Sequence, residues 1–255
     1  MDLGISGKVA LVAAASSGLG LAVAKELARE GAHVALCARD PVKLEAARAQ
    51  VDALGTGQVR ATALDLRDHA AAAAWVESTA EAFGALHIVV TNTSNPTGGP
   101  ASTLKLEDYR SAFEGVLLST IAIAQAALPH LRKAGWGRLL FITSETVKQP
   151  VARYTLSSTS RLGIVGYAKC LVQDLGDSGV TVNVLAPGYH RTPLLERYAG
   201  ADVEAGLAAI AERIPLKKLG RPEDFGALVA FLASERAAFI TGTVQLVDGG
   251  NTLGF

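Results

Sequence analysis

One short turn of small side chains has the residue types and the spacing to bind a phosphate. Its sequence is Ser16-Ser17-Gly18-Leu19-Gly20. It follows an apolar run, Val9 to Ala13, and precedes Leu21 to Glu30, where apolar side chains recur at helical spacing. A strand, a turn and a helix in this order direct backbone N–H groups and the positive helix end at a phosphate, and glycine leaves room for its approach. The turn therefore predicts a phosphate site, although a tight turn between two packed elements explains both glycines equally well.

Other kinds of site find little support in the sequence. No cluster of His or Cys has the spacing of metal ligands, so we expect no metal. No Gly-x-Ser-x-Gly segment occurs, so Ser144 has no hydrolase context. Cys37 and Cys170 lack the spacing of a disulfide framework, which is typical of a reduced, cytoplasmic protein.

The charges of the chain balance, with 24 Lys and Arg against 24 Asp and Glu over 255 residues. No basic excess favours binding to nucleic acid or to an anionic membrane. The first residues lack the basic and then apolar pattern of a signal peptide. The longest uncharged run, Gly115 to Leu131, is short and polar for a membrane span. We therefore expect a cytoplasmic protein with no nucleic-acid or membrane partner.

Apolar runs of strand length alternate with stretches of helical periodicity, which is typical of a doubly wound α/β protein with a parallel sheet. The predicted strands are 9–13, 33–37, 59–64, 88–91, 139–143, 180–185 and 244–247. The predicted helices are 21–30, 42–54, 69–83, 106–131, 156–175, 203–213 and 223–234. Pro129 is expected to bend or end the fourth of these helices. Without a linker or repeat, the sequence predicts one Rossmann-type domain over 1–255, with about seven strands and helices on both faces.

In such a sheet, ligands bind outside the carboxyl ends of the strands. The segments at those ends are 14–20, 38–40, 65–66, 92–99, 144–156 and 186–193. We expect these segments to converge on one crevice.

Several motifs occur in a fixed order along the chain. They are Ser16-Ser17-Gly18-Leu19-Gly20, Asp65-Leu66, Val182-Asn183-Val184-Leu185-Ala186-Pro187-Gly188, Gly220-Arg221-Pro222-Glu223-Asp224, and Ile240-Thr241-Gly242 followed by Val247-Asp248-Gly249-Gly250. Each is weak alone, but together they resemble the short-chain dehydrogenase/reductase family over nearly the whole chain. The resemblance is greatest to its 3-oxoacyl-carrier-protein-reductase-like members, and it implies a bound nicotinamide dinucleotide.

The resemblance assigns the dinucleotide to residues in several of these motifs. They are Ser16, Ser17, Gly18, Leu19, Gly20, Arg39, Asp65, Leu66, Asn92, Arg161, Pro187, Gly188 and Thr192. Asp65 would accept a hydrogen bond from the adenine amino group, or would instead cap the next helix. Asn92 would hold the backbone near the ribose. The chain has Ala14 and Ser94 where the family has glycine, and we expect binding to survive with a shifted phosphate loop.

Arg39 stands where the family discriminates between cofactors. An acidic residue there accepts hydrogen bonds from a ribose hydroxyl, whereas a guanidinium binds a 2′-phosphate with two parallel bonds. Arg39 therefore predicts NADP rather than NAD. The alternative is a solvated arginine paired with Asp40 or Glu45.

The catalytic pattern of the family is where the chain departs most. The family uses an Asn in the long helix, a Ser after the fifth strand, and Tyr-x3-Lys in the next helix, where the Tyr exchanges a proton with the substrate oxygen. The corresponding residues here are Val116, Ser144, Ser157 and Arg161. Arg161 keeps a positive charge, but Ser157 cannot replace the Tyr as an acid, because the pKa of an alcohol lies far above that of a phenol. Loss of a general acid costs about 10² to 10⁴ in rate.

Two other side chains, Tyr154 and His190, could exchange a proton in place of that Tyr. Tyr154 lies three residues before Ser157 and shares its helical face, although an ordinary half-buried Tyr fits this position as well. His190 lies in the loop that overlies the nicotinamide in the family and titrates near neutral pH, but a lone loop His is more often exposed. Glu145 could accept a proton beside Ser144 and is expected to be solvated.

The sequence therefore predicts an NADP(H)-dependent oxidoreductase that resembles 3-oxoacyl-carrier-protein reductases and acts on the carbonyl or hydroxyl group of a small molecule. The alternative is a family member that binds the dinucleotide without turnover, as a sensor, scaffold or assembly subunit. The helix over 106–131 is apolar on more than one face. Because the corresponding helix packs against a symmetry mate in the family, we expect a homodimer or homotetramer.

Overall fold

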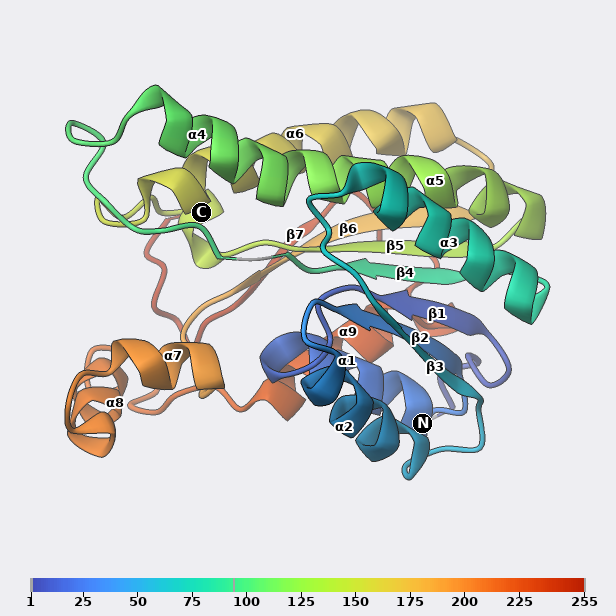
Figure 1. Ribbon diagram of the computed structural model, residues 1–255, viewed down its shortest axis with the longest axis horizontal. Helices are drawn as coiled ribbons and strands as arrows, with labels where there is room; N and C mark the ends of the chain where they lie inside the picture. Colours follow the sequence, from blue (N-terminus) through green and yellow to red (C-terminus); the bar gives the residue numbers. More distant parts are fainter. Residues whose placement is uncertain (1, 94, 255) are drawn as a thin grey trace.

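The computed structural model describes residues 2–93 and 95–254 and contains a parallel sheet of 7 strands in the order β3-β2-β1-β4-β5-β6-β7 (Figure 1). The strands are β1 (Val9–Val12), β2 (His33–Ala38), β3 (Val59–Ala63), β4 (Ile88–Thr91), β5 (Gly137–Ile142), β6 (Val180–Pro187) and β7 (Val244–Val247). The strand order reverses between β1 and β4, so the crevice expected in a doubly wound sheet opens at the carboxyl ends of these strands. The predicted α/β class and Rossmann-type fold are confirmed.

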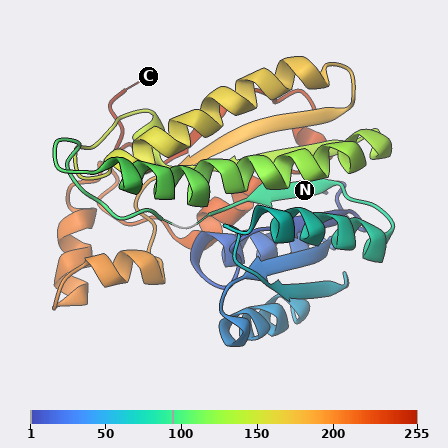
Figure 2. The same cartoon turned by 45° about the horizontal axis from the view of Figure 1, so that its top comes forward.

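Helices cover both faces of the sheet (Figure 1). One face carries α1 (Gly18–Arg29), α2 (Pro41–Asp52) and α9 (Pro222–Leu232), and the other carries α3 (His69–Phe83), α4 (Leu106–Ala112), α5 (Ser119–Ala134) and α6 (Thr155–Leu175). The short helices α7 (Pro193–Tyr198) and α8 (Val203–Ala211) project from one end of the molecule in both views (Figures 1 and 2). Single turns of 3-10 helix lie at Glu145–Val147 and Glu235–Ala237.

The central strands are buried on both faces, which explains why the sequence shows them as continuous apolar runs. Alternate residues of β1 point to opposite faces of the sheet. Leu11 packs in the apolar cluster between the sheet and helices α3, α5 and α6, whereas Ala10 and Val12 pack in the cluster between the sheet and helices α1 and α9. Helix ends follow local signals. Asp40 caps α2, Asp68 caps α3, and α3 ends at Gly84 with φ of 77°.

The long helix over 106–131 differs from the prediction. It does not end at Pro129; α5 runs through that residue to Ala134. Buried Ala127 and Leu131 hold this segment against the sheet, and packing outweighs the hydrogen bond that proline removes. The irregular turn lies earlier, in a π-helix over Phe113–Leu118, whose widened turn the sequence did not indicate.

By length and composition alone, the helical stretch Leu106–Ala134 could cross a membrane. In this fold, 44% of its most apolar window is buried in the protein, and it forms one of the layers that cover the sheet. A core helix passes the same test, so the stretch gives no support for a membrane span.

Candidate functional site

A cavity of about 900 Å³ extends along the carboxyl ends of the strands and is lined by all of the predicted segments. Of the predicted site residues, those that line it are Ser16, Ser17, Gly18, Leu19, Arg39, Asp65, Leu66, Asn92, Ser144, Tyr154, Ser157, Arg161, Pro187, Gly188 and Thr192. Gly20 lies just behind the wall. A Cβ on Gly20 would come within 2.5 Å of the Ala14 carbonyl oxygen, so only glycine permits α1 to approach the turn this closely.

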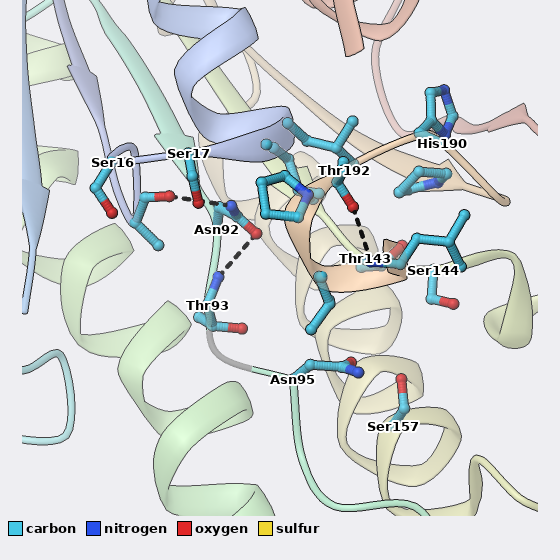
Figure 3. Close-up of a pocket in the computed structure, with 18 of the residues that line it drawn as sticks. Ser16, Ser17, Asn92, Thr93, Asn95, Thr143, Ser144, Ser157, His190 and Thr192 are labelled. Carbon is cyan, nitrogen blue, oxygen red and sulfur yellow. Dashed lines mark hydrogen bonds between the residues drawn. The ribbon is translucent and has the colours of Figure 1, made fainter. Parts of the chain in front are cut away.

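The turn after β1 presents unpaired donors to the cavity. Helix α1 begins at Gly18, and the hydroxyl of its N-cap residue, Ser17, makes no capping hydrogen bond. The first-turn N–H groups and this hydroxyl are therefore available to an anion. Ala14, where the family has glycine, adopts a left-handed backbone with φ of 50°. The Asn92 amide donates to the Ala14 carbonyl oxygen over 3.5 Å and so ties the turn to the end of β4 (Figure 3).

Arg39 lies exposed at one end of the cavity, and its two alternative acidic partners are engaged elsewhere. Asp40 accepts hydrogen bonds from the backbone N–H groups of Val42 and Lys43, and Glu45 is paired with Arg48. The guanidinium of Arg39 makes no ion pair with any residue that the structure describes. It is thus placed to meet an anion entering the cavity.

Asp65 lines the same end, and its alternative role as a helix cap is wrong. Its carboxylate accepts a hydrogen bond from the backbone N–H of Arg67 over 3.0 Å, whereas Asp68 caps α3. Lys43 and Arg67 also line this end of the cavity. Sequence reasoning missed both, although each follows a predicted site residue within a few positions.

At the other end, Ser144 and Ser157 line the cavity (Figure 3), and Arg161, which the motif spacing places with them, lines it as well. Ser144 follows β5, and Ser157 and Arg161 lie one turn apart in α6. The Nε of Arg161 donates to Ser157 Oγ over 3.1 Å, and Nη1 donates to the Ile142 carbonyl oxygen over 3.3 Å. The side chain of Arg161 is only 5% exposed, and burial lowers its pKa to about 10. Among the described residues, no carboxylate lies within ion-pair distance of it.

Val116 does not face this group. It is 1% exposed and packs with Ile123, Phe141 and Ile164 in the core, whereas its neighbour Gly115 lines the cavity. The π-helical turn determines which of these residues points inward, and the sequence could not show it. An amide restored at Val116 would therefore enter an apolar cluster.

Two expectations about the exposure of titratable side chains, those of Glu145 and His190, are corrected by burial. Glu145 is not solvated but 8% exposed; burial raises the pKa of its carboxyl, and Asn251 donates to it over 3.0 Å. His190 is not an exposed loop residue but 5% exposed, with its ring edge-on to Phe225, and burial lowers its pKa. In Figure 3, His190 and Ser157 lie at opposite sides of the pocket, so His190 is poorly placed to serve Ser157.

Tyr154 is half-buried, as expected, and lines the cavity directly before α6. Tyr189, which sequence reasoning did not single out, lines it as well; burial, and then nearby Tyr154 and Glu145, raise the pKa of its phenol to about 12. Thr93 and Asn95 were also missed, although both lie in a predicted segment. Ser94, between them, lies outside the described residues.

One wall of the cavity comes from α7, which the sequence pattern did not predict. Thr192 caps this helix through a hydrogen bond from the backbone N–H of Leu195, and its methyl group lies 3.4 Å from the position of a Cβ on Gly18. The helix therefore closes over the phosphate-binding turn. None of its residues is buried, so few contacts hold it in place.

Comparisons with known proteins agree with this geometry. A family model described as Enoyl-(Acyl carrier protein) reductase matches residues 13–252. Oxidoreductase UcpA of Salmonella typhimurium is 34% identical, with 98% of this chain and 96% of that protein covered. D-threitol dehydrogenase of Mycolicibacterium smegmatis is 32% identical, and the match covers 99% of this chain and 95% of that protein. L-sorbose reductase from Gluconobacter frateurii, solved with NADPH and L-sorbose, superposes with a TM-score of 0.96 at 29% identity, and both chains are fully covered.

Proposed function

The chain belongs to the short-chain dehydrogenase/reductase family, and on that premise we propose that it is an NADP(H)-dependent oxidoreductase acting on the carbonyl or hydroxyl group of a small molecule. The observation that supports this most is the cavity itself. It joins Arg39, the N-terminus of α1 and the pair Ser144 and Arg161 in one space of about 900 Å³. The likeness to 3-oxoacyl-carrier-protein reductases suggests the substrate class.

The residues present fit the dinucleotide. The close contact at Gly20, the uncapped hydroxyl of Ser17 and the free first turn of α1 suit a pyrophosphate, and Arg39 suits the 2′-phosphate of NADP(H). Asp65 would bind the adenine, and Asn92, Pro187, Gly188 and Thr192 would enclose the nicotinamide half. When bound, NADP(H) supplies or accepts the hydride.

The chemistry left to the chain is weaker than in the family. Ser144 and Ser157 can each donate a hydrogen bond to a substrate oxygen, and Arg161 lends a positive charge that would stabilise negative charge developing there. Neither serine releases its proton near neutral pH. We therefore expect turnover about 10² to 10⁴ times slower than with a positioned general acid.

A second candidate is a protein that binds the dinucleotide without turnover. It is favoured by one observation: the residue at the family's Tyr position is Ser157, whose hydroxyl accepts a hydrogen bond from Arg161 and does not release its proton near neutral pH. NADPH fluorescence together with a panel of ketones separates the two. Slow NADPH oxidation at high protein concentration supports the enzyme, and binding without any oxidation supports the second candidate.

Restoring the family pair tests the enzyme proposal directly. Ser157→Tyr with Arg161→Lys should raise ketone reduction by about two to four powers of ten, because it returns the general acid. Melting temperature measured on the same variant controls for a clash between the new ring and the cavity wall. A well-folded variant that binds NADPH but reduces no ketone would reject the proposal.

We also propose that the chain is a cytoplasmic homodimer or homotetramer. Leu118 and Leu162, on adjacent helical segments, are 38% and 43% exposed, and Leu106 and Phe113 of the same long helical stretch are exposed as well. A second copy would cover these side chains. Sedimentation at micromolar concentration tests this proposal, and a monomer would contradict it.

A further inference from the structure

The two serines at the reacting end of the cavity each have a hydroxyl proton available to a ligand. An arginine N–H can only donate, so Ser157 Oγ is the acceptor of its bond with Arg161. Ser144 Oγ likewise accepts from the backbone N–H of Thr146 over 3.3 Å. Within residues 2–93 and 95–254, neither hydroxyl donates to a protein acceptor. Both protons are therefore free to point into the cavity.

A buried positive charge is hydrogen-bonded to one of these hydroxyls, that of Ser157. The guanidinium of Arg161 has more N–H groups than its two hydrogen bonds use, and it faces no carboxylate among the described residues. Glu145 lines the same end of the cavity, where its Oε2 accepts a hydrogen bond from Asn251 and lies near Gly188, and it makes no ion pair with Arg161. An uncompensated buried cation is unfavourable, and an anion seated at the two serines would compensate it.

Further donors surround the same space. In Figure 3, Asn95, Ser144 and Ser157 lie around one open region of the pocket. A ligand with several acceptor oxygens would satisfy more of these groups than a single carbonyl could.

We propose that this end of the cavity binds the carboxylate of a small organic anion through the hydroxyls of Ser144 and Ser157, with the charge of Arg161 beside Ser157. The inference deepens the proposed function and rests on it for the position of the ligand beside the dinucleotide. A neutral ketone would leave the guanidinium charge uncompensated, whereas a carboxylate provides two acceptor oxygens and a full negative charge. The ligand held at this end of the cavity is accordingly a carboxylic acid rather than a simple ketone.

The probes are butyrate and butyramide, which have nearly the same shape and differ in charge. Their dissociation constants are measured by ligand-observed NMR at low ionic strength, with and without NADPH. We expect butyrate to bind about tenfold or more tightly than butyramide, because hydrogen bonds to charged groups are the stronger ones. Arg161→Met should abolish this preference, Arg161→Lys should retain most of it, and Ser144→Ala with Ser157→Ala should weaken butyrate binding about tenfold or more.

Arg110→Met is the matched control, because Arg110 is an exposed arginine of α4 that does not line the cavity. This variant should bind both probes as the wild type does. Equal affinity for the two probes, no measurable butyrate binding, or an undiminished preference in Arg161→Met would each overturn the inference. If Arg161→Met does not fold, the serine variant decides alone. A preference for butyrate without NADPH binding would reject the proposed function and leave this inference standing. NADPH binding without a preference for butyrate would reject this inference and leave the proposed function standing.

Discussion

Replacing Arg161 with methionine should stabilise the free protein, although it removes two hydrogen bonds. Burial lowers the pKa of this guanidinium to about 10. A fall of that size from the ordinary value of an arginine corresponds to about 3 kcal/mol of cost for holding the charged form in the fold. The bonds to Ser157 and Ile142 return about 1 kcal/mol each. Methionine fills a similar volume without the charge, so the net gain is about 1 kcal/mol.

For a domain of this length, that gain corresponds to a rise in melting temperature of about 2 to 4 °C. The assay is thermal unfolding of the wild type and of Arg161→Met at neutral pH, with Arg161→Lys as the variant that keeps the charge. The pKa of the Arg161 guanidinium is lower in the folded protein than in the unfolded chain. The free-energy cost of burying its charged form is therefore fully present below pH 10. Above that, the wild type gains stability with pH as the folded guanidinium loses its proton, and the advantage of the variant shrinks. A melting temperature several degrees lower in Arg161→Met would refute the reasoning, since the hydrogen bonds would then contribute more than burial costs.

Three further predictions concern other parts of the cavity. Ala14→Gly should raise the free energy of unfolding by about 0.5 to 1 kcal/mol, because alanine at φ of 50° is strained. Denaturant titration measures this free energy, and an unchanged or lower value in the variant would contradict the prediction. The wild type should bind NADPH more tightly than NADH in fluorescence titrations, and Arg39→Asp should reverse or abolish this preference. Equal affinity of the wild type for the two dinucleotides would contradict the prediction. Burial raises the pKa of the Glu145 carboxyl, so the wild type should lose stability relative to Glu145→Gln as the pH rises through and above the usual glutamate range. Melting curves at several pH values test this, and parallel curves for the two proteins would count against it.

The elements that the sequence determined are those set by local patterns. The apolar runs that became β4 and β7, and the alanine-rich stretch that became α3, have the predicted bounds, because an apolar strand and a capped helix each leave a signature in neighbouring residues. The order of strands and helices then required a doubly wound sheet. Its topology brought the strand ends into one cavity, as predicted.

Only the tertiary structure decided what each side chain of the site meets. A π-helical turn sends Val116 into the core, packing carries α5 past Pro129, and burial removes Glu145 and His190 from solvent. These outcomes depend on residues distant in sequence, which no local pattern records.

The state of the reacting group was decided in the same way. Spacing placed Ser157 and Arg161 on one face of a helix, but it could not show that the guanidinium is buried without a carboxylate or that it donates to the serine. Charge compensation and hydrogen-bond direction are properties of the whole enclosure, formed here by the ends of several strands and by α6. The sequence therefore identifies the altered catalytic pair, and the fold determines that this pair presents donors and a positive charge to a ligand.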